Sequence, residues 1–472
     1  MFDKKNLLTN PKLFKRILIA NRGEVALRII KACKELGIET VAVYSEADQH
    51  SPHLDQADMK ICIGPGASSQ SYLNREAIIQ AAINTECQAL HPGFGFLAED
   101  SLFAYMCEQS KVTFIGPTAH SIRLMGNKSQ AKQTMKQAGL PTIPGSEGNL
   151  RDLNEALKIA KEMGYPVLLK ATAGGGGKGI RRCNDEKELR SLFPQAKMEA
   201  EKAFGDAALY LEKLILNGRH IEFQVLADSY NNLPAPRLRQ AGVIHLGERE
   251  CSIQRKNQKL IEESPSPAVD AKLRNAMGEQ IVESIRKIGY RNAGTIEFLM
   301  DENKNLYFME MNTRLQVEHP VTEMITGFDI VNEQIKIAAN HTLSINQTEV
   351  KFSGHAIECR INAEDPENNF LPSPGVITAF KTSLNGGPGK IRLDTHVQKG
   401  YEIPPFYDSM ICKIIAHGET RKAAIETMKN ALKIFEIKGV KTTIPLHLEI
   451  LNSKDFERGE YHTNWLSEIM EI

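Results

Sequence analysis

Glu297, Glu310 and Asn312 are three oxygen-bearing side chains spaced so that they could hold a metal ion. They lie in two apolar, β-favouring runs, residues 295–301 and 306–312, and the polar turn between the runs predicts an antiparallel hairpin. Carboxylates that face each other on a buried sheet repel and lose hydration unless a cation compensates them. Mg²⁺ takes oxygen ligands of this kind. The pattern therefore predicts a magnesium site; the alternative is a solvated pair at a sheet edge.

The register of this hairpin follows from the length of its turn. With four turn residues, Asp301 pairs with Leu306, and Glu297 then lies directly opposite Glu310. Asn312, two residues further on, points to the same face. We therefore expect the two carboxylates and the amide to share one face of the ribbon.

A glycine-rich turn, residues 174–179, lies between the predicted strands Tyr165–Ala171 and Ile180–Cys183. It contains G-x-G-x-x-G, but a strand follows where a dinucleotide-binding fold needs a helix. No Ser or Thr follows its Gly-Lys pair, which argues against a Walker A loop. A glycine hairpin can instead close its backbone N–H groups over a polyphosphate, with Lys170 as a phosphate partner. The alternative is a flexible loop in solvent.

Three further patterns allow both a functional and an ordinary interpretation. The basic run Cys251–Lys259 is either a solvated face or a site for an anion. The loop His91–Leu97, at a strand end, is either a ligand-facing turn or an ordinary tight turn. Arg360 lies in the alternating strand His355–Asn362, where an arginine is usually exposed unless the face it joins is acidic.

The composition indicates a globular protein of two or three domains. The chain has 472 residues, 42% of them apolar, which is enough for full cores. Its 58 basic and 58 acidic side chains balance, which argues against bulk binding of nucleic acid or anionic membranes. The eight cysteines are scattered without a CxxC pair, so we expect a reducing, cytoplasmic setting. The chain lacks both a run of about 18 apolar residues and an apolar N-terminus, so neither a membrane span nor a signal peptide is predicted.

Alternating strands and helices position these groups. A strand at Arg16–Ala20, a helix at Val25–Leu36 and a strand at Glu39–Tyr44 form a β-α-β unit, which predicts a doubly wound parallel sheet. The pattern repeats with strands at 60–63, 89–91 and 113–115 and helices at 74–84 and 101–109. Later helices are predicted at 127–138, 152–163, 188–203, from Asp270, at 329–340 and at 423–435, and later strands at 209–216 and 221–227.

Together these patterns describe an ATP-using ligase, and several stretches resemble the biotin carboxylase subunit of biotin-dependent carboxylases, an ATP-grasp family. They are IANRGEVALRII, HPGFGFLAED, GYPVLLKATAGGGGKG, ERECSIQRKNQKLIEE, EMNTRLQVEHPVTEMITG, GHAIECRINAEDP and FLPSPG. The resemblance extends from about Leu13 to Tyr461. It implies an α/β and α+β fold: a doubly wound parallel-sheet domain over 13–127, an ATP-grasp domain over 128–340 with a mobile glycine-rich lid at about 143–214, and a mixed α+β C-terminal domain over 352–461.

The resemblance implies a role for each matched residue. ATP contacts fall on Lys128, Lys170, Gly175, Gly176, Gly177, Glu212, Lys213, Ile215, His220, Asn257, Glu297 and Glu310. Metal ligands fall on Glu297, Glu310 and Asn312, and bicarbonate contacts fall on Lys259, Arg314 and Val317. Catalytic roles fall on Lys259, Arg314, Glu318 and Arg360, and biotin contacts fall on Arg360 and Phe94.

The implied reaction uses ATP to activate bicarbonate. Glu318 would remove the bicarbonate proton, and the resulting oxygen would attack the γ-phosphate to give carboxyphosphate and ADP. Mg²⁺ or Mn²⁺ would offset the charge on the phosphates. Lys259 and Arg314 would hold bicarbonate, and Arg360 would stabilise the enolate-like oxygen of biotin.

The sequence departs from the family pattern in three places. Phe94 stands where many members have tyrosine, Asn257 stands where many have histidine, and the aromatic and basic residues associated with dimerisation are not evident around 385–390. A homodimer is still expected. The Met-Lys pairs at 135–136 and 428–429 lack the setting of a biotin-attachment lysine. Biotin is therefore expected on a separate carrier protein, with a separate carboxyltransferase subunit and with neither nucleic acid nor membrane as a partner.

Two alternatives stay open. A different ATP-grasp ligase, such as a carbamoyl-phosphate synthase-like enzyme or a purine-biosynthesis carboxylase, would share the hairpin and flap but need not carry Lys259, Arg314, Glu318 and Arg360 together. A nucleotide-binding regulatory subunit with a decayed site would have lost some of these residues. The sequence does not distinguish among acetyl-CoA, which would mean a role in fatty acid biosynthesis, propionyl-CoA, pyruvate and a 2-oxo acid as the final acceptor.

Overall fold

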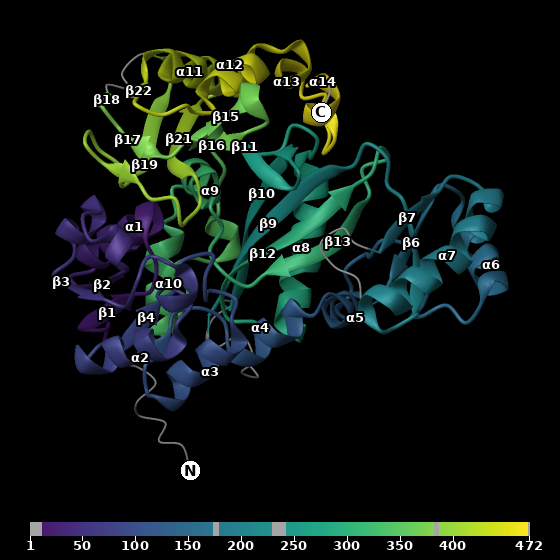
Figure 1. The fold of residues 1–472 in the computed structure, drawn as a ribbon, viewed down its shortest axis with the longest axis horizontal. Helices are drawn as coiled ribbons and strands as arrows, with labels where there is room; N and C mark the ends of the chain where they lie inside the picture. The colour runs from purple at the N-terminus through teal and green to yellow at the C-terminus, as the bar shows by residue number, and fades with distance from the viewer. Residues whose placement is uncertain (1–11, 173–178, 229–241, 382–386, 471–472) are drawn as a thin grey trace. The chain divides into compact units, whose positions relative to one another are not determined.

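The computed structural model describes residues 12–172, 179–228, 242–381 and 387–470 (Figure 1). The chain divides into two compact units. The main unit comprises Met1–Leu140, Arg219–Phe298 and Glu310–Ile472, and the small unit comprises Pro141–Gly218 and Leu299–Met309. No helix within the described ranges is long and apolar enough to cross a bilayer. All eight cysteines lie in those ranges and none forms a disulfide.

The N-terminal sheet of the main unit is parallel, as the β-α-β pattern predicts. Its strand order is β3-β2-β1-β4-β5, and each neighbouring pair is parallel. Ile17 and Ile19 of β1 pack into one core and Leu18 packs into another, so both faces of the sheet are buried. The strands are β1 Arg16–Ile19, β2 Glu39–Tyr44, β3 Met59–Cys62, β4 Ala89–His91 and β5 Thr113–Phe114. The helices are α1 Gly23–Glu35, α2 Arg75–Asn84, α3 Ser101–Gln109, α4 Ala119–Gly126 and α5 Lys128–Ala138, with short 3₁₀ helices at Glu46–Asp48, Pro52–Gln56 and Ser68–Gln70.

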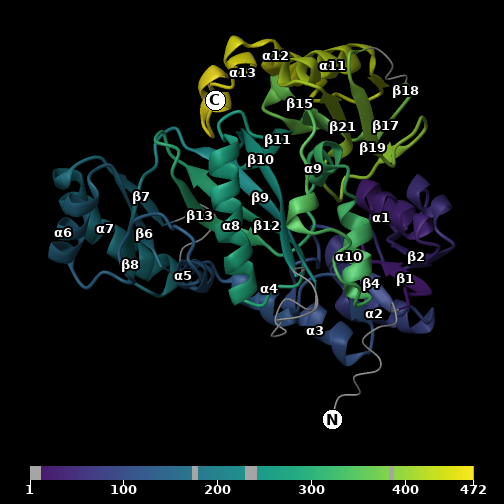
Figure 2. The same ribbon diagram turned by 180° about the vertical axis from the view of Figure 1, so that it is seen from behind.

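A second, eight-stranded sheet joins the middle of the chain to its C-terminal part. Its order is β13-β12-β9-β10-β11-β14-β21-β19, and the neighbouring pairs from β9 to β19 are antiparallel. Its strands are β9 Arg219–Ala227, β10 Val243–Arg255, β11 Gln258–Ser264, β12 Asn292–Met300, β13 Leu306–Asn312, β14 His355–Asn362, β19 Lys390–Thr395 and β21 Met410–Gly418. The long helix α8, Ala271–Lys287, lies along one face of β9 and β10 (Figure 2). Asp270 accepts a hydrogen bond from the Leu273 backbone N–H and begins this helix, as predicted.

The basic run Cys251–Lys259 forms a hairpin between β10 and β11, which the sequence did not predict. Residues 251–254 are buried, so the solvated-face interpretation is wrong for that part of the run. Lys256 and Asn257 make the two-residue turn with φ angles of 48° and 69°. Positive φ at both central positions is the geometry that matches the twist of a tight hairpin.

A bulge in β11 decides which of its side chains share a face. Two consecutive residues of β10 pair with Ile261 and Lys259, so Leu260 is an extra residue in β11. Strand alternation alone would place Lys259 and Glu262 on opposite faces. The extra residue reverses the alternation, and Lys259 and Glu262 therefore share one face of the sheet.

The two faces of β11 and β14 meet different surroundings. On one face, Ala356 of β14 packs against Val321 of α9, His319–Thr326. On the other face, Ile261 joins the C-terminal core beneath α11, Arg421–Ile434. We call the first the site face and the second the core face.

The remaining elements of the main unit surround these sheets. The helices are α10 Ile330–Ala338, α12 Ile444–Asn452, α13 Lys454–Arg458 and α14 Trp465–Ile469, with 3₁₀ helices at Gln347–Glu349 and Pro366–Asn368. The short strands are β15 Glu364–Asp365, β16 Leu371–Pro372, β17 Gly375–Val376, β18 Ala379–Lys381, β20 Glu402–Ile403 and β22 Glu436–Lys438.

Besides the tip of the β12–β13 hairpin, the small unit contains a three-stranded antiparallel sheet and two helices. Its strand order is β7-β6-β8, and Leu169 of β6 packs with Phe193 of α7 in its core. The strands are β6 Val167–Ala171, β7 Ile180–Cys183 and β8 Leu209–Lys213, and the helices are α6 Leu153–Met163 and α7 Glu186–Phe204. The predicted glycine flap falls at 174–179, almost wholly outside the described residues.

The turn between β12 and β13 is tighter than predicted. The backbone N–H of Asp301 donates to the carbonyl of Asn305 at 3.0 Å, so the predicted pairing of Asp301 with Leu306 is wrong. The side chain of Asp301 stabilises this shorter turn by accepting a hydrogen bond from the Asn305 N–H at 2.8 Å. The direct opposition of Glu297 and Glu310 was counted from the longer turn, and it stays a prediction.

Candidate active site

Lys259 lies at the centre of a buried group of charges in the main unit. Its ammonium donates to Glu222 Oε2 at 2.7 Å, to Glu297 Oε1 at 3.0 Å and to Glu318 Oε1 at 2.6 Å. Glu222 comes from β9, Glu297 comes from β12, and Glu318 directly precedes α9. The sheet and the start of one helix thus bring together four side chains that are far apart in the sequence.

Arg360 of β14 extends this group along the site face. Its Nε donates to Glu262 Oε1 at 2.6 Å, and its Nη2 donates to Glu318 Oε2 at 2.8 Å. Glu318 is therefore bound through one oxygen by Lys259 and through the other by Arg360. Arg360 joins an acidic, buried face, which was the condition for a functional arginine in that strand.

Arg249 of β10 closes the other end of the group. It is fully buried and its Nε donates to Glu222 Oε1 at 2.5 Å, while other nitrogens bond to neutral side chains, including Thr322 of α9. The charges then alternate in sign along the series Arg249, Glu222, Lys259, Glu318, Arg360 and Glu262. Buried charges are tolerated when each has an opposite neighbour, so the alternation explains how this group can be buried.

The alternation sets the protonation of each member. Burial would raise the pKa of Glu318, but Lys259 and Arg360 outweigh burial and hold that pKa well below its usual value. Burial would lower the pKa of Lys259, but its three carboxylates raise it well above its usual value. Glu262 differs, because burial outweighs Arg360 and raises its pKa to about 7. Glu318 is therefore an anion whose basicity depends on the cations around it.

The carboxylates near His220 offer ligands for a divalent ion. Ligand atoms of His220, Glu222 and Glu297 lie within 4.8 Å of one another, and all three residues are buried. Asn312 Nδ2 donates to Glu297 Oε1 at 2.8 Å, so the amide and this carboxylate share a face, as predicted. An oxygen-rich set of this kind fits Mg²⁺ or Mn²⁺.

Lys128 and Glu310 form a separate and more exposed pair. The Lys128 ammonium lies 3.1 Å from Glu310 Oε2, and the Lys128 side chain is 83% exposed. An ammonium this exposed is accessible to a phosphate group. Of the three predicted metal ligands, the structure thus shows Glu297 bonded to Asn312 and places Glu310 against Lys128.

Arg314 is held by partners from two parts of the main unit. Its Nε donates to Glu99 Oε2 at 2.8 Å, its Nη1 to Gln316 Oε1 at 2.7 Å and its Nη2 to Asn312 Oδ1 at 2.9 Å. Glu99 belongs to the HPGFGFLAED stretch, so that segment positions Arg314. Nη1 also donates to the Leu315 carbonyl at 3.2 Å, so four of the five N–H groups of this guanidinium already have protein partners, and its contact with bicarbonate stays a prediction.

Three other predicted contacts lie at the edges of the charged group or in turns. The Val317 carbonyl accepts a hydrogen bond from Lys413 Nζ at 2.9 Å. Phe94 is half-buried against the N-terminal core, and its carbonyl accepts from Asn21 Nδ2 at 2.7 Å. Asn257 is exposed in the β10–β11 turn. The ligand roles of Val317, Phe94 and Asn257 stay predictions.

The predicted nucleotide residues of the small unit are described in part. Lys170 of β6 forms a short ion pair with Glu212 of β8. The Lys213 ammonium donates to two backbone carbonyls just before β6, at 2.8 and 3.2 Å, and its backbone N–H donates to the Pro144 carbonyl at 2.8 Å, so its contact with ATP stays a prediction. Ile215 is half-buried after β8. Gly175, Gly176 and Gly177 lie outside the described residues.

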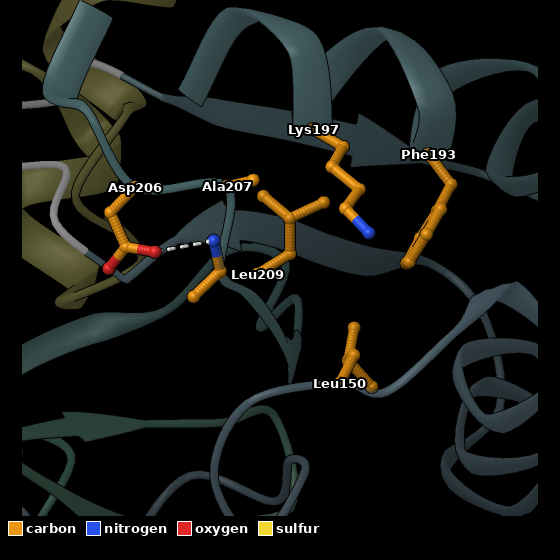
Figure 3. A pocket seen from close by; sticks show the side chains of 7 residues that line it. Leu150, Phe193, Lys197, Asp206, Ala207 and Leu209 are labelled. Atoms are coloured by element: carbon orange, nitrogen blue, oxygen red, sulfur yellow. Dashed lines mark hydrogen bonds between the residues drawn. The ribbon is translucent and has the colours of Figure 1, made fainter. Parts of the chain in front are cut away.

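A cavity of about 220 Å³ lies in the small unit, and none of the predicted site residues lines it. Lys197 and Phe193 extend toward it from α7, and Leu150 lines its opposite side (Figure 3). Asp206, at its edge, accepts a hydrogen bond from the Ala208 backbone N–H at 2.9 Å (Figure 3). Its lining belongs to the body of the small unit and includes no member of the charged group.

Comparison with known proteins identifies the family. The family model for the N-terminal domain of biotin carboxylase matches residues 13–122, the model for its C-terminal domain matches 358–468, and the model for the ATP binding domain of the carbamoyl-phosphate synthase L chain matches 127–346. Biotin carboxylase 1 of Bacillus subtilis is 54% identical over 455 residues, covering 96% of this chain and 98% of its own. The chain belongs to the biotin carboxylase family. It is thus an ATP-grasp ligase, and the predicted fold class is confirmed.

Other biotin carboxylases give the same result. The small subunit of 2-oxoglutarate carboxylase from Hydrogenobacter thermophilus is 52% identical, covering 97% of this chain and 94% of its own. The solved biotin carboxylase domain of a thermophilic 2-oxoglutarate carboxylase, bound to bicarbonate, has a TM-score of 0.90 and 50% identity, covering 98% and 99% of the two chains. The Hydrogenobacter thermophilus domain dimer, in complex with MgADP, ADP and bicarbonate, has a TM-score of 0.85 and 52% identity, covering 98% of each chain.

Sequence reasoning missed several members of this biotin carboxylase site. Glu222, Arg249 and Glu262 were not singled out, because their partners come from other strands. Lys259, for example, is 37 residues from Glu222 and 59 from Glu318. The available signal was a glutamate inside the apolar run IEFQVLA, since a buried charge needs a partner.

Proposed function

We propose that this biotin carboxylase uses ATP and bicarbonate to carboxylate biotin on a separate carrier protein, with carboxyphosphate as the intermediate. The observation that carries the proposal is the position of Glu318, which has one carboxylate oxygen on Lys259 and the other on Arg360. A base between two cations can take a proton from a bound anion while the cations offset the developing charge. The bicarbonate and MgADP bound to the solved relatives support the same chemistry.

The first half-reaction makes carboxyphosphate. Lys259, Arg314 and the main chain at Val317 hold bicarbonate, and Glu318 takes its proton. The bicarbonate oxygen then attacks the γ-phosphate of ATP and displaces ADP. We assign nucleotide contacts to Lys128, Lys170, Gly175, Gly176, Gly177, Glu212, Lys213, Ile215, His220 and Asn257.

A divalent ion belongs to this half-reaction. Glu297, Glu310 and Asn312 would hold Mg²⁺ or Mn²⁺, with His220 and Glu222 beside them. When bound, the ion neutralises charge on the phosphates. The exposed ammonium of Lys128 adds a second positive charge for the transferred group.

The second half-reaction carboxylates biotin. Carboxyphosphate yields CO₂ and phosphate, and the phosphate takes the N1 proton of biotin. Arg360 stabilises the negative charge on the ureido oxygen of biotin, which then attacks CO₂ through N1. Phe94 would contact biotin through its ring, without the hydroxyl that many relatives have.

We further propose that the chain acts in the cytoplasm as a homodimer that serves a biotin carrier protein and a carboxyltransferase subunit. The dimer in the solved relative supports the homodimer. The final acceptor is acetyl-CoA, as in fatty acid biosynthesis, or another acyl-CoA or 2-oxo acid. Relatives include the small subunit of 2-oxoglutarate carboxylase and a biotin carboxylase subunit of pyruvate carboxylase. Copurification of the carboxyltransferase from the source cells would identify the acceptor.

The test of the activity is ADP release by the purified chain. ADP should form from MgATP only when bicarbonate is present, and free biotin should accelerate it. Equal ADP release without bicarbonate would refute the carboxylase proposal and favour another ATP-grasp ligase.

A further inference from the structure

Glu262 and Glu358 are two buried carboxyl groups to which the proposed reaction gives no role. They are direct cross-strand partners on β11 and β14, and both are 0% exposed. Directly opposite residues of an antiparallel pair have neighbouring side chains on one face of the sheet. Both oxygens of Glu358 and Oε2 of Glu262 have no hydrogen-bond partner in the part of the chain that the structure describes.

This arrangement requires a proton. Two adjacent buried carboxylates cannot both ionise without compensating charge. Among the described residues, Arg360 is the cation that bonds to Glu262, and neither oxygen of Glu358 has such a partner. Arg360 also serves Glu318, so it does not supply a full positive charge to Glu262. A neutral member of the pair removes the repulsion.

Arg360 connects the pair to the base. Glu262 and Glu318 each accept one hydrogen bond from its guanidinium, at 2.6 and 2.8 Å, so they compete for one positive charge. When Glu262 is neutral, the charge of Arg360 stabilises the anion of Glu318 and makes Glu318 a weaker base. When Glu262 is ionised, it neutralises part of that charge, and Glu318 accepts a proton more readily.

We propose that Glu262 and Glu358 form a proton-sharing carboxyl pair that sets the basicity of Glu318 through Arg360. Glu358 is the member that stays neutral, and Glu262 is the member that ionises as the pH rises. Both are positioning residues, because they act through Arg360 and not on a substrate. The inference rests on the proposed function, in which Glu318 is the base.

The titratable groups that surround the pair support this division. They are Cys251 of β10, Lys259 of β11, Glu318 directly before α9, Arg360 of β14 and Lys413 of β21. Burial raises the pKa of Glu262 to about 7 against the opposing effect of Arg360. Burial raises the pKa of Glu358 well above its usual value, although Lys413 opposes it. The Lys413 ammonium is already bound by the Val317 carbonyl at 2.9 Å and lies 3.1 Å from Glu24 Oε1.

The test is the pH dependence of bicarbonate-dependent ADP release without biotin, at saturating bicarbonate and with correction for the bicarbonate–CO₂ equilibrium. The wild-type rate should rise about ten-fold as the pH passes about 7, because Glu262 ionises there. Glu262→Gln should lose this rise and keep the low rate. Glu358→Gln replaces one neutral group with another, so it should keep the rise and stay within about three-fold of the wild-type rate.

Three outcomes would overturn the proposal. A rise that persists in Glu262→Gln would remove Glu262 as the titrating group. A rise that moves about one pH unit or more lower in Glu358→Gln would mean that Glu358 is an anion. A wild-type infrared difference spectrum between about pH 6 and about pH 8 without the loss of a carboxylic-acid C=O band would contradict the shared proton whatever the variants do. The wild-type difference spectrum should show the loss of this C=O band as the pH rises, and the difference spectrum of Glu262→Gln should not show it.

Glu318→Gln separates this inference from the proposed function. If Glu318→Gln abolishes ADP release but Glu262→Gln keeps the pH rise, the carboxyl pair is wrong and the function stands. If Glu318→Gln keeps bicarbonate-dependent ADP release, Glu318 is not the base, and the proposed function and the inference both fail.

Discussion

Two neighbouring glutamates on β11 meet opposite surroundings on the two faces of the strand. On the core face, Glu263 contacts His355 Nε2 at 2.5 Å and accepts hydrogen bonds from Arg421 at 2.7 and 3.0 Å and from Tyr461. These partners outweigh burial and lower the pKa of Glu263 to about 2. On the site face, Glu262 shares a single arginine with the base, and burial raises its pKa to about 7.

The difference shows what separates a structural carboxylate from a functional one. A buried carboxylate with more donors than it needs is fixed as an anion and contributes to stability. A buried carboxylate that shares its donor keeps a proton near neutral pH and can respond to charge changes at the site. The carboxylates on the site face of β11 and β14 therefore serve the reaction, and Glu263 on the core face stabilises the fold.

The largest effect should come from removing the cation at the centre of the site face. Lys259→Met leaves Glu222, Glu297 and Glu318 without their common partner and removes a bicarbonate contact. Bicarbonate-dependent ADP release should fall by about 10³-fold or more. The matched control is Arg421→Met on the core face, which removes a cation that is 17% exposed, against 11% for Lys259, and should leave the turnover of folded molecules within about three-fold. If the rate of bicarbonate-dependent ADP release by Lys259→Met stayed within about ten-fold of the wild-type rate, the proposed difference between the two faces would be contradicted.

A smaller loss is expected at the metal ligands. Glu297→Gln or Glu310→Gln removes one carboxylate charge and should lower turnover by about 100-fold, about 2.7 kcal/mol of transition-state stabilisation. Both variants should also need more Mg²⁺ for half-maximal ADP release. Near-normal turnover of both at low Mg²⁺ would mean that the β12–β13 hairpin is structural.

The smallest effect on turnover should come from the core face. Glu263→Gln breaks a buried network, so it should lower the free energy of unfolding by about 3–5 kcal/mol near pH 7 and leave turnover within about three-fold. The folded pKa of about 2 lies below the usual 4.5, so this stabilisation is complete above about 4.5 and is lost as the pH falls toward 2. Urea unfolding should therefore show the gap between wild type and variant shrinking as the pH is lowered. A gap that does not change with pH would contradict the assigned anion.

Much of the fold could be predicted from local sequence patterns. The alternation of strands and helices predicted the parallel sheet, and Asp270 indicated the start of α8. The apolar runs of the hairpin predicted β12 and β13 as neighbours, and they are adjacent in the sheet. Such features depend on residues close in sequence, which is why patterns along the chain can reveal them.

Features that depend on distant residues were not predictable in this way. The bulge at Leu260 turns Lys259 toward the site face. This bulge is recognised from the pairing of β11 with β10, which joins residues that are distant from a local sequence pattern. Arg249 and Glu222 have no distinguishing pattern in the sequence, and their ion pair becomes evident only from the pairing of β9 with β10. The motifs of the family supplied Glu318 and Arg360, whereas physical reasoning from the sequence gave Arg360 only a condition, an acidic face, that the structure meets.

The most direct test of the account compares Arg360→Ala with Glu318→Gln, measuring ADP release with and without biotin. Arg360 only adjusts the basicity of Glu318 in the first half-reaction, whereas it stabilises the charge on biotin in the second. Arg360→Ala should therefore keep most of the slow, bicarbonate-dependent ADP release and lose biotin carboxylation by roughly 10²–10³-fold. Glu318→Gln should suppress both activities, because no nucleophile forms without the base. Equal loss of both activities in Arg360→Ala, with the fold intact by circular dichroism, would contradict the division of roles on the site face and remove Arg360 from the biotin step.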